Sequence, residues 1–109
     1  MTRRQAGKRG EAIADAALRR AGYTILDKNW RCAAGELDVV ARHRDDIVFV
    51  EVRARRDGTD AALESIAGRK QAKLAELAQA YLSAHGLDGA PFRIDVAAVD
   101  LAEIGRAHV

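Results

Sequence analysis

The chain has 109 residues, a net charge of +2 and an isoelectric point near 9.0. Hydrophobic residues make up 49% and charged residues 31%, a balance that is typical of a folded domain and excludes a disordered chain. No apolar run approaches the roughly 20 residues that cross a bilayer, the basic N-terminus lacks the apolar segment of a secretory signal, and the lone Cys32 cannot form an internal disulfide, so we expect a single cytoplasmic domain over residues 1–109.

The first predicted element is a helix over residues 10–22, in which apolar residues recur every three or four positions. It ends at Gly22, a typical C-terminal stop. Glu11 lies three residues before Ala14, at the edge of the apolar stripe, so we expect its side chain to face whatever the helix packs on. Residues 1–9 are basic, and we expect them to be flexible.

Three strands are predicted next, at residues 23–31, 36–43 and 46–53. A turn around residues 43–45 joins the second strand to the third. Because this turn is so short, the two strands are expected to pair as an antiparallel hairpin.

A second helix is predicted over residues 66–84, with Gly86 just past its end. Lys70 lies four residues after Ile66 and four residues before Leu74, both of which belong to the apolar stripe. The side chain of Lys70 is therefore expected to point toward the sheet and not away from it.

Pro91 opens the last predicted strand, residues 92–99, where a proline is tolerated at the first position. Residues 100–109 carry little signal and are expected to form a C-terminal tail. The order helix, three strands, helix, strand predicts a mixed α/β domain in which the helices cover a sheet.

Carboxylates occupy one face of the predicted hairpin. Since side chains alternate along a strand, Glu36 and Asp38 share a face of the second strand, and Glu51 and Arg53 share a face of the third. If the turn is centred between Arg44 and Asp45, Asp38 lies opposite Glu51, and Glu36 lies opposite Arg53. In the same register Val39 lies opposite Val50. A slip of two residues would keep the same faces, so this pairing is the simplest register but not the only one.

Two carboxylates that face each other on a sheet repel unless a positive charge lies between them. A divalent cation held by Asp38 and Glu51 would remove the repulsion, and an all-oxygen ligand set suits Mg²⁺ or Mn²⁺ better than zinc. The alternative is a ladder of surface ion pairs, with Arg53 bound to Glu36 and Arg55 bound to Glu51.

Basic residues gather in three segments despite the small net charge. Such clusters suit the phosphate backbone of a nucleic acid, whereas the alternative is a set of solvated surface charges. The basic residues concerned are Arg3, Arg4, Lys8 and Arg9; Arg53, Arg55 and Arg56; and Arg69, Lys70 and Lys73.

Five stretches of the chain occur together in an order that resembles the bacterial YraN family. They are GEAIADAALRRAGY (10–23), GELDVV (35–40), FVEVRAR (49–55), Lys70 and FRIDVAAV (92–99). That family is similar in fold to the archaeal Holliday-junction resolvases of the PD-(D/E)XK nuclease superfamily. The resemblance runs from about Gly10 to Val99 and implies a restriction-endonuclease-like core.

The resemblance also implies roles for individual residues. Asp38 matches the motif aspartate, Glu51 matches the acidic residue of the E-x-K element, and Glu11 matches the helix glutamate that can complete a metal site. Family members usually have lysine where this chain has Arg53, which stays protonated and can only stabilise charge. Lys70 is an alternative source of an ammonium group; otherwise it is a lysine whose stem covers apolar surface.

The resulting hypothesis is a Mg²⁺- or Mn²⁺-dependent endonuclease that acts on DNA, selected by branched structure and not by sequence. Its catalytic residues would be Asp38, Glu51, Arg53 and Lys70, and its basic clusters would hold the phosphate backbone. Two other classes stay open at this point: a non-catalytic DNA-binding module, and a protein-interaction domain. Many resolvase-like nucleases are dimers, so a homodimer is open as well.

Overall fold

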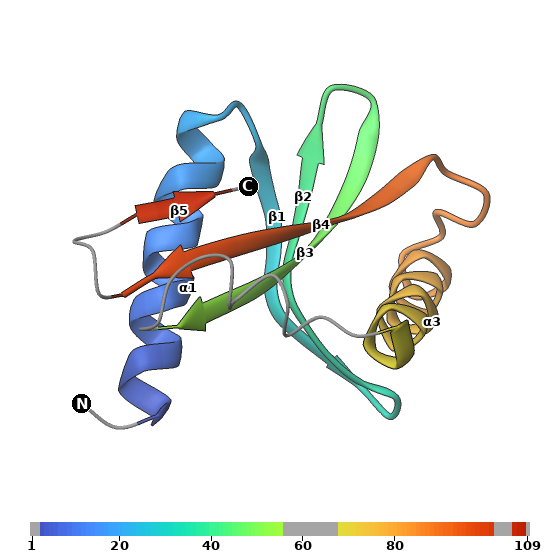
Figure 1. Ribbon diagram of the computed structural model, residues 1–109. Coiled ribbons are helices and arrows are strands. Elements are labelled where there is room, and N and C mark those ends of the chain that lie inside the picture. The colour runs from blue at the N-terminus through green and yellow to red at the C-terminus, as the bar shows by residue number, and fades with distance from the viewer. Residues whose placement is uncertain (1–2, 56–67, 102–105, 109) are drawn as a thin grey trace.

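A computed structural model describes residues 3–55, 68–101 and 106–108 and shows a five-stranded sheet with two helices (Figure 1). The first six elements agree in type and order with those expected from residue periodicity, and a seventh, β5, was not expected. They are α1 Arg3–Arg20, β1 Thr24–Cys32, β2 Gly35–His43, β3 Asp46–Arg55, α3 Gly68–Ala84, β4 Phe92–Asp100 and β5 Arg106–His108.

The sheet is mixed, with the strand order β1-β2-β3-β4-β5. Strands β3 and β4 are parallel, and the chain passes through α3 between them, while the other neighbouring pairs are antiparallel. The predicted α/β class is confirmed, because a helix, three strands, a second helix and a fourth strand follow in the order of a restriction-endonuclease-like core. Neither α1 nor α3 has the length and apolar character needed to cross a bilayer.

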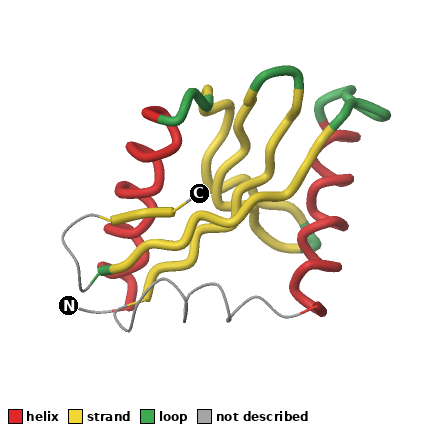
Figure 2. The backbone as a smooth tube through the Cα atoms, turned by 45° about the horizontal axis from the view of Figure 1, so that its top comes forward, coloured by secondary structure: helices red, strands yellow, loops and turns green. Residues whose placement is uncertain are grey.

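Each helix covers its own apolar cluster, and the two helices lie on opposite sides of the sheet (Figure 2). The cluster under α1 contains Ala14, Leu18, Val39, Ala41, Val48, Val50, Ala97, Val99 and Leu101. The cluster under α3 contains Leu37, Val40, Ile47, Phe49, Leu74, Leu77, Ala78, Tyr81 and Leu82. The alternation of β3, with its valines on one face and Phe49 on the other, therefore supplies both clusters.

The β1–β2 hairpin turns along its length from one helix toward the other. Val39 packs in the α1 cluster, but Leu37 packs in the α3 cluster, although residues two apart on a flat strand share a face. At the tip of the hairpin, a side chain at Gly35 would come within 3.6 Å of Leu77 on α3. The change of direction falls between positions 37 and 39, at Asp38.

The N-terminal segment differs from the expectation of a flexible stretch, because α1 begins at Arg3 and includes residues 3–9. Gly10, which reads as the start of a helix, lies inside it and is buried. A Cβ atom at Gly10 would lie 2.6 Å from the Cβ of Ala54, so this glycine allows α1 to approach β3 closely. The small residue reflects packing between two elements, which the periodicity of one helix cannot reveal.

The C-terminal tail is also more ordered than expected. Residues 106–108 form β5, which pairs antiparallel with β4 from Ala98–His108 to Asp100–Arg106. Three residues are too few to show strand alternation, and this strand owes its existence to the free edge of β4.

Candidate metal centre

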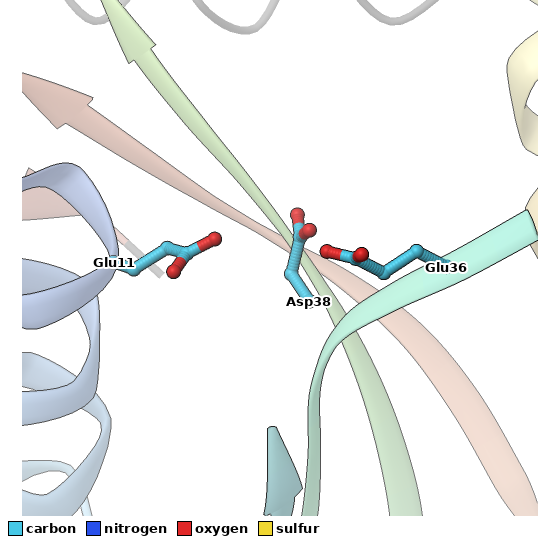
Figure 3. A group of neighbouring side chains, drawn as sticks. All are labelled: Glu11, Glu36 and Asp38. Carbon is cyan, nitrogen blue, oxygen red and sulfur yellow. The ribbon is translucent and has the colours of Figure 1, made fainter. Parts of the chain in front are cut away.

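Three carboxylates from two elements meet beside the bend in β2. Glu11 lies on α1, while Glu36 and Asp38 lie on β2, and one carboxylate oxygen from each residue falls within 4.8 Å of the others. All three residues are partly buried. Figure 3 shows the Glu11 side chain extending from the helix toward Asp38, with Glu36 reaching the same point from the strand.

Asp38 lies where β2 separates from β3. The ladder between these strands runs from His43–Asp46 to Val39–Val50, so the predicted pairing of Val39 with Val50 is confirmed. One position further along, the backbone N–H of Val52 donates a hydrogen bond of 2.9 Å to Asp38 Oδ2. The carboxylate of Asp38 thus replaces a strand carbonyl as acceptor at the point of separation.

Glu51 lies next to Asp38, and its side chain is only 11% exposed. Burial, together with the negative charge of Asp38, raises the pKa of Glu51 to about 7. Burial also raises the pKa of Asp38, against the opposing effects of the Val52 N–H and a hydrogen bond with Glu51. A protonated Glu51 can therefore donate a hydrogen bond to the carboxylate of Asp38.

Arg53 supplies the nearest positive charge to this pair. Its Nη2 lies 3.3 Å from Glu51 Oε1, yet Nε and Nη2 of Arg53 are buried without a hydrogen-bond partner. The contact is close enough to be an ion pair but lacks hydrogen-bond geometry. Arg53 therefore offsets the charge of Glu51 while two of its own nitrogen atoms stay unsatisfied.

The predicted position of Glu36 opposite Arg53 is wrong. Glu36 instead accepts a hydrogen bond of 2.5 Å from Arg31 Nε on β1. The ladder between β2 and β3 ends at Val39–Val50, so Glu36 is paired with Arg31 of β1 and with no residue of β3. The ion-pair ladder thus lacks its Glu36–Arg53 rung, and the side chain of Arg55 lies outside the described residues.

The basic residues can be placed only in part. Lys8 and Arg9 are exposed on α1, and Lys73 is exposed on α3, where it pairs with Glu76 at 3.6 Å. Of the remaining basic candidates, Arg56 lies outside the described residues. For the others, the structure describes the backbone but not the side chain. These others are Arg3, Arg4, Arg55, Arg69 and Lys70.

The site contains residues that the sequence did not single out as ligands. The strand pattern put Glu36 on the face of Asp38, two residues away, but only as the partner of Arg53 in the alternative ladder of ion pairs. Asn29 has a φ angle of 55°, and its side chain opposes the rise in the pKa of Glu11 that burial and the charge of Asp38 cause. An asparagine inside a predicted strand was a signal for that backbone conformation, since asparagine tolerates positive φ better than most residues.

Comparisons with known proteins agree with these motifs. Residues 10–99 match the model of a family described as "Uncharacterised protein family UPF0102". A UPF0102 protein of Roseiflexus castenholzii is 52% identical over 102 residues, which cover 91% of this chain and 82% of the relative. One from Chloroflexus aurantiacus is 53% identical over 98 residues, covering 89% and 80% respectively.

The fold and the grouped carboxylates define an α/β domain with a nuclease-like core and a candidate metal centre. By the family match and the identities above, the chain belongs to UPF0102, the YraN family that its motifs resemble. A third relative, a UPF0102 protein of Moorella thermoacetica, is 49% identical over 100 residues, covering 91% of this chain and 83% of the relative.

Proposed function

We propose that this chain is a cytoplasmic, metal-dependent endonuclease that hydrolyses DNA phosphodiester bonds and prefers branched DNA. The observation that carries the proposal is the meeting of Glu11, Glu36 and Asp38 within 4.8 Å, beside the mostly buried Glu51. Four carboxyl groups with few compensating charges disfavour the folded protein unless a cation binds among them.

The ligand chemistry fits Mg²⁺ or Mn²⁺. The available donors are carboxylate oxygens, which these hard cations prefer, and histidine and cysteine contribute nothing to this group within the described residues. Glu11, Glu36 and Asp38 would hold the cation, with Glu51 as a fourth ligand once it is deprotonated. A bound cation would polarise the scissile phosphate and lower the pKa of an attached water.

The protein's own side chains would supply the remaining functions. Arg53 keeps a positive charge beside Glu51, where it can stabilise negative charge that develops on a phosphate. Lys8 and Arg9, exposed on α1 two to three residues before Glu11, can bind backbone phosphates on either side of the cleaved bond. Lys70 stays a candidate for a second positive charge at the site.

The test is cleavage of duplex, flap and four-way DNA in Mg²⁺ or Mn²⁺. We expect the four-way substrate to be cleaved and the Asp38→Asn, Glu51→Gln double variant to be inactive. Asp45→Asn, which removes an exposed carboxylate from the β2–β3 turn, serves as the control and should cleave normally. Absence of cleavage by the wild-type protein, or equal cleavage by the double variant, would overturn the proposal.

A second candidate is a DNA-binding module without catalytic activity, and Arg53 is the residue that favours it. Arginine stays protonated and cannot act as a base. An arginine in place of the motif lysine therefore removes one route to proton transfer. This module would bind DNA in a salt-dependent manner and keep that affinity in the Asp38→Asn, Glu51→Gln variant. Failure to bind DNA, combined with oligomers that grow with protein concentration in sedimentation, would instead indicate a protein-interaction domain or homodimer.

A further inference from the structure

An arginine occupies a position in the β2–β3 turn that favours glycine. His43 pairs with Asp46, so Arg44 and Asp45 form a two-residue loop. Arg44 has a φ angle of 57°, and a positive φ at the first loop residue is typical of type II′ turns, which favour glycine because it has no Cβ. An arginine costs stability at this position, so the turn alone does not explain its presence.

The loop stands on side chains that already have partners. Arg93 of β4 donates hydrogen bonds to Asp46 at 3.0 Å and to His43 Nδ1 at 2.7 Å. The His43 ring also stacks on the ring of Tyr23, with the two centroids 4.2 Å apart. These contacts hold both residues that flank the loop, so Arg44 is presented from a rigid support.

Three arginines at this end of the molecule have no side-chain partner in the part of the chain that the structure describes. Arg42 and Arg44 are exposed on the hairpin, and Arg20 is exposed in the last turn of α1, three residues before Tyr23. Figure 1 shows the end of α1 and the β2–β3 turn at the same end of the sheet. Among the described residues of the loop, only the carboxylate of Asp45 opposes these three positive charges without a partner of its own.

Three guanidinium groups without partners suit an extended anion. The planar guanidinium binds phosphate in a bidentate manner, which a point charge does not. The three side chains come from a strand, a turn and a helix end, so a ligand that contacts them all has to present several anionic groups along its length. Double-stranded DNA does so, with one negative charge for about every 1.7 Å of helix axis.

We propose that Arg20, Arg42 and Arg44 form a surface, the hairpin-end surface, that binds the phosphate backbone of a duplex arm. The inference rests on the proposed function, because a nuclease that prefers branched DNA has to hold the arms that leave the branch. Arg44 is six residues along the chain from Asp38, which is roughly 20 Å in an extended strand. The hairpin-end surface therefore contacts DNA away from the acidic residues, and its binding does not depend on a cation.

The test measures the affinity for a short DNA duplex by fluorescence anisotropy over a series of NaCl concentrations, in EDTA so that no metal-dependent cleavage occurs. The triple variant Arg20→Gln, Arg42→Gln, Arg44→Gly should bind more weakly than wild type. The slope of log K against log[NaCl] should become shallower by about 2.7, since each lost phosphate contact accounts for about 0.9.

Arg44→Gly alone separates a role in binding from a role in folding. Glycine adopts the positive φ without strain, so this variant should melt about 2–4 °C higher than wild type. Its salt slope should nevertheless become shallower by about 0.9. A lower melting temperature with unchanged DNA affinity would mean that Arg44 is kept for the turn, and would overturn its place in the surface.

Arg19→Gln is the matched control. It removes the same charge from the position next to Arg20, but from a side chain that already contacts Asp15 at 2.7 Å. This variant should keep the wild-type salt slope. An equal change of slope in Arg19→Gln and Arg20→Gln would show that overall charge, and not contact with phosphate, sets the affinity, and the hairpin-end surface would be wrong.

The outcomes separate this surface from the proposed function. If wild type cleaves DNA and the triple variant binds DNA with wild-type affinity and slope, the hairpin-end surface is wrong and the proposed function stands. If wild type cleaves no DNA but the triple variant loses DNA affinity, the surface stands and the endonuclease is wrong. If wild type neither binds nor cleaves DNA, both are wrong.

Discussion

Within the residues that the structure describes, two partly buried clusters of polar side chains differ in how completely their charges are matched. In the first, the Arg93 cluster, the guanidinium of Arg93 contacts four neighbours from three strands and the loop before β1. Nε lies 3.2 Å from Asp95 Oδ2, Nη1 lies 3.0 Å from Asp46, and Nη2 lies 2.7 Å from His43 Nδ1 and 3.4 Å from the Tyr23 hydroxyl. The Tyr23 hydroxyl in turn donates to Asp95 at 3.0 Å.

The second, the acidic cluster, consists of Glu11, Glu36, Asp38 and Glu51. Its carboxyl groups exceed the positive charges that contact them, and the guanidinium of Arg53 has two nitrogen atoms without hydrogen-bond partners. A polar cluster that is fully hydrogen-bonded stabilises a fold, whereas one with unmatched charge costs stability and is typical of functional sites. The difference indicates that the Arg93 cluster is structural and that the acidic cluster is kept for another purpose.

The largest expected effect concerns pH and the stability of the acidic cluster. The pKa of Glu51 is raised to about 7 in the folded protein, compared with an ordinary value of 4.5. Its favourable contribution to the free energy of unfolding is therefore fully present below pH 4.5 and is lost as pH rises through about 7. Glu51→Gln removes this carboxyl and should raise the free energy of unfolding at pH 8 by on the order of 2 kcal/mol, with little change at pH 5. Urea denaturation at both pH values measures it. An equal effect at pH 5 and pH 8 would show that Glu51 is matched in charge after all.

The next effect concerns the close contact between α1 and β3, which positions Glu11 in the acidic cluster. Gly10→Ala places a Cβ atom 2.6 Å from that of Ala54, and we expect it to destabilise the protein by about 1–3 kcal/mol and to weaken Mn²⁺ binding, since Glu11 is the next residue. Gly7→Ala, in the same helix with no atom within 4 Å of the added Cβ, is the matched control. It should stabilise by roughly 0.5–1 kcal/mol, as alanine does in a helix interior. Equal effects of the two substitutions would contradict the close contact at Gly10.

A smaller effect is expected at the Arg93 cluster. Arg93→Met leaves Asp46, Asp95 and His43 without their common donor, and should lower the free energy of unfolding by about 1–2 kcal/mol, a range limited by the 33% exposure of the arginine side chain. Thermal and urea denaturation measure it, with the exposed Arg42→Met as control. Mn²⁺ affinity should stay unchanged, and a loss of affinity would mean that the two clusters are not independent.

The comparison also shows which features a sequence can predict. Strand alternation and a two-residue turn were enough to predict the register of Val39 with Val50, because both are local properties of one hairpin. The close approach of α1 to β3 at Gly10 and the formation of β5 could not be predicted in this way. Both depend on contacts with a distant element, Ala54 in the first case and the edge of β4 in the second.

At the candidate site, too, local features could be predicted and features that depend on distant elements could not. Asp38 and Glu51 were predicted as neighbours from parity, and Glu11 was expected from the resemblance to lie with them. The meeting of Glu36 with Glu11 depends on the turn of β2 at Asp38. Side-chain alternation assumes a flat strand and therefore cannot predict such a turn. Asn29 was the local sign of irregularity, since its backbone breaks the alternation of β1 at the same position.

The smallest expected effect tests how Arg53 contributes to the acidic cluster. Its positive charge lowers the pKa of Glu51, although Nε and Nη2 of Arg53 have no hydrogen-bond partner. If only the charge matters, Arg53→Lys should keep the pKa of Glu51 within about half a unit of the wild-type value, whereas Arg53→Met should raise it further. The carboxyl carbon shift of Glu51, followed by ¹³C NMR across pH, measures both.

An equal rise in the two Arg53 variants would mean that the planar guanidinium is required. The shape of the Arg53 guanidinium would then matter at its site as it does for Arg93. The two clusters would differ only in the balance of their charges. A lysine that preserves the pKa of Glu51 would instead indicate that this position needs only a cation.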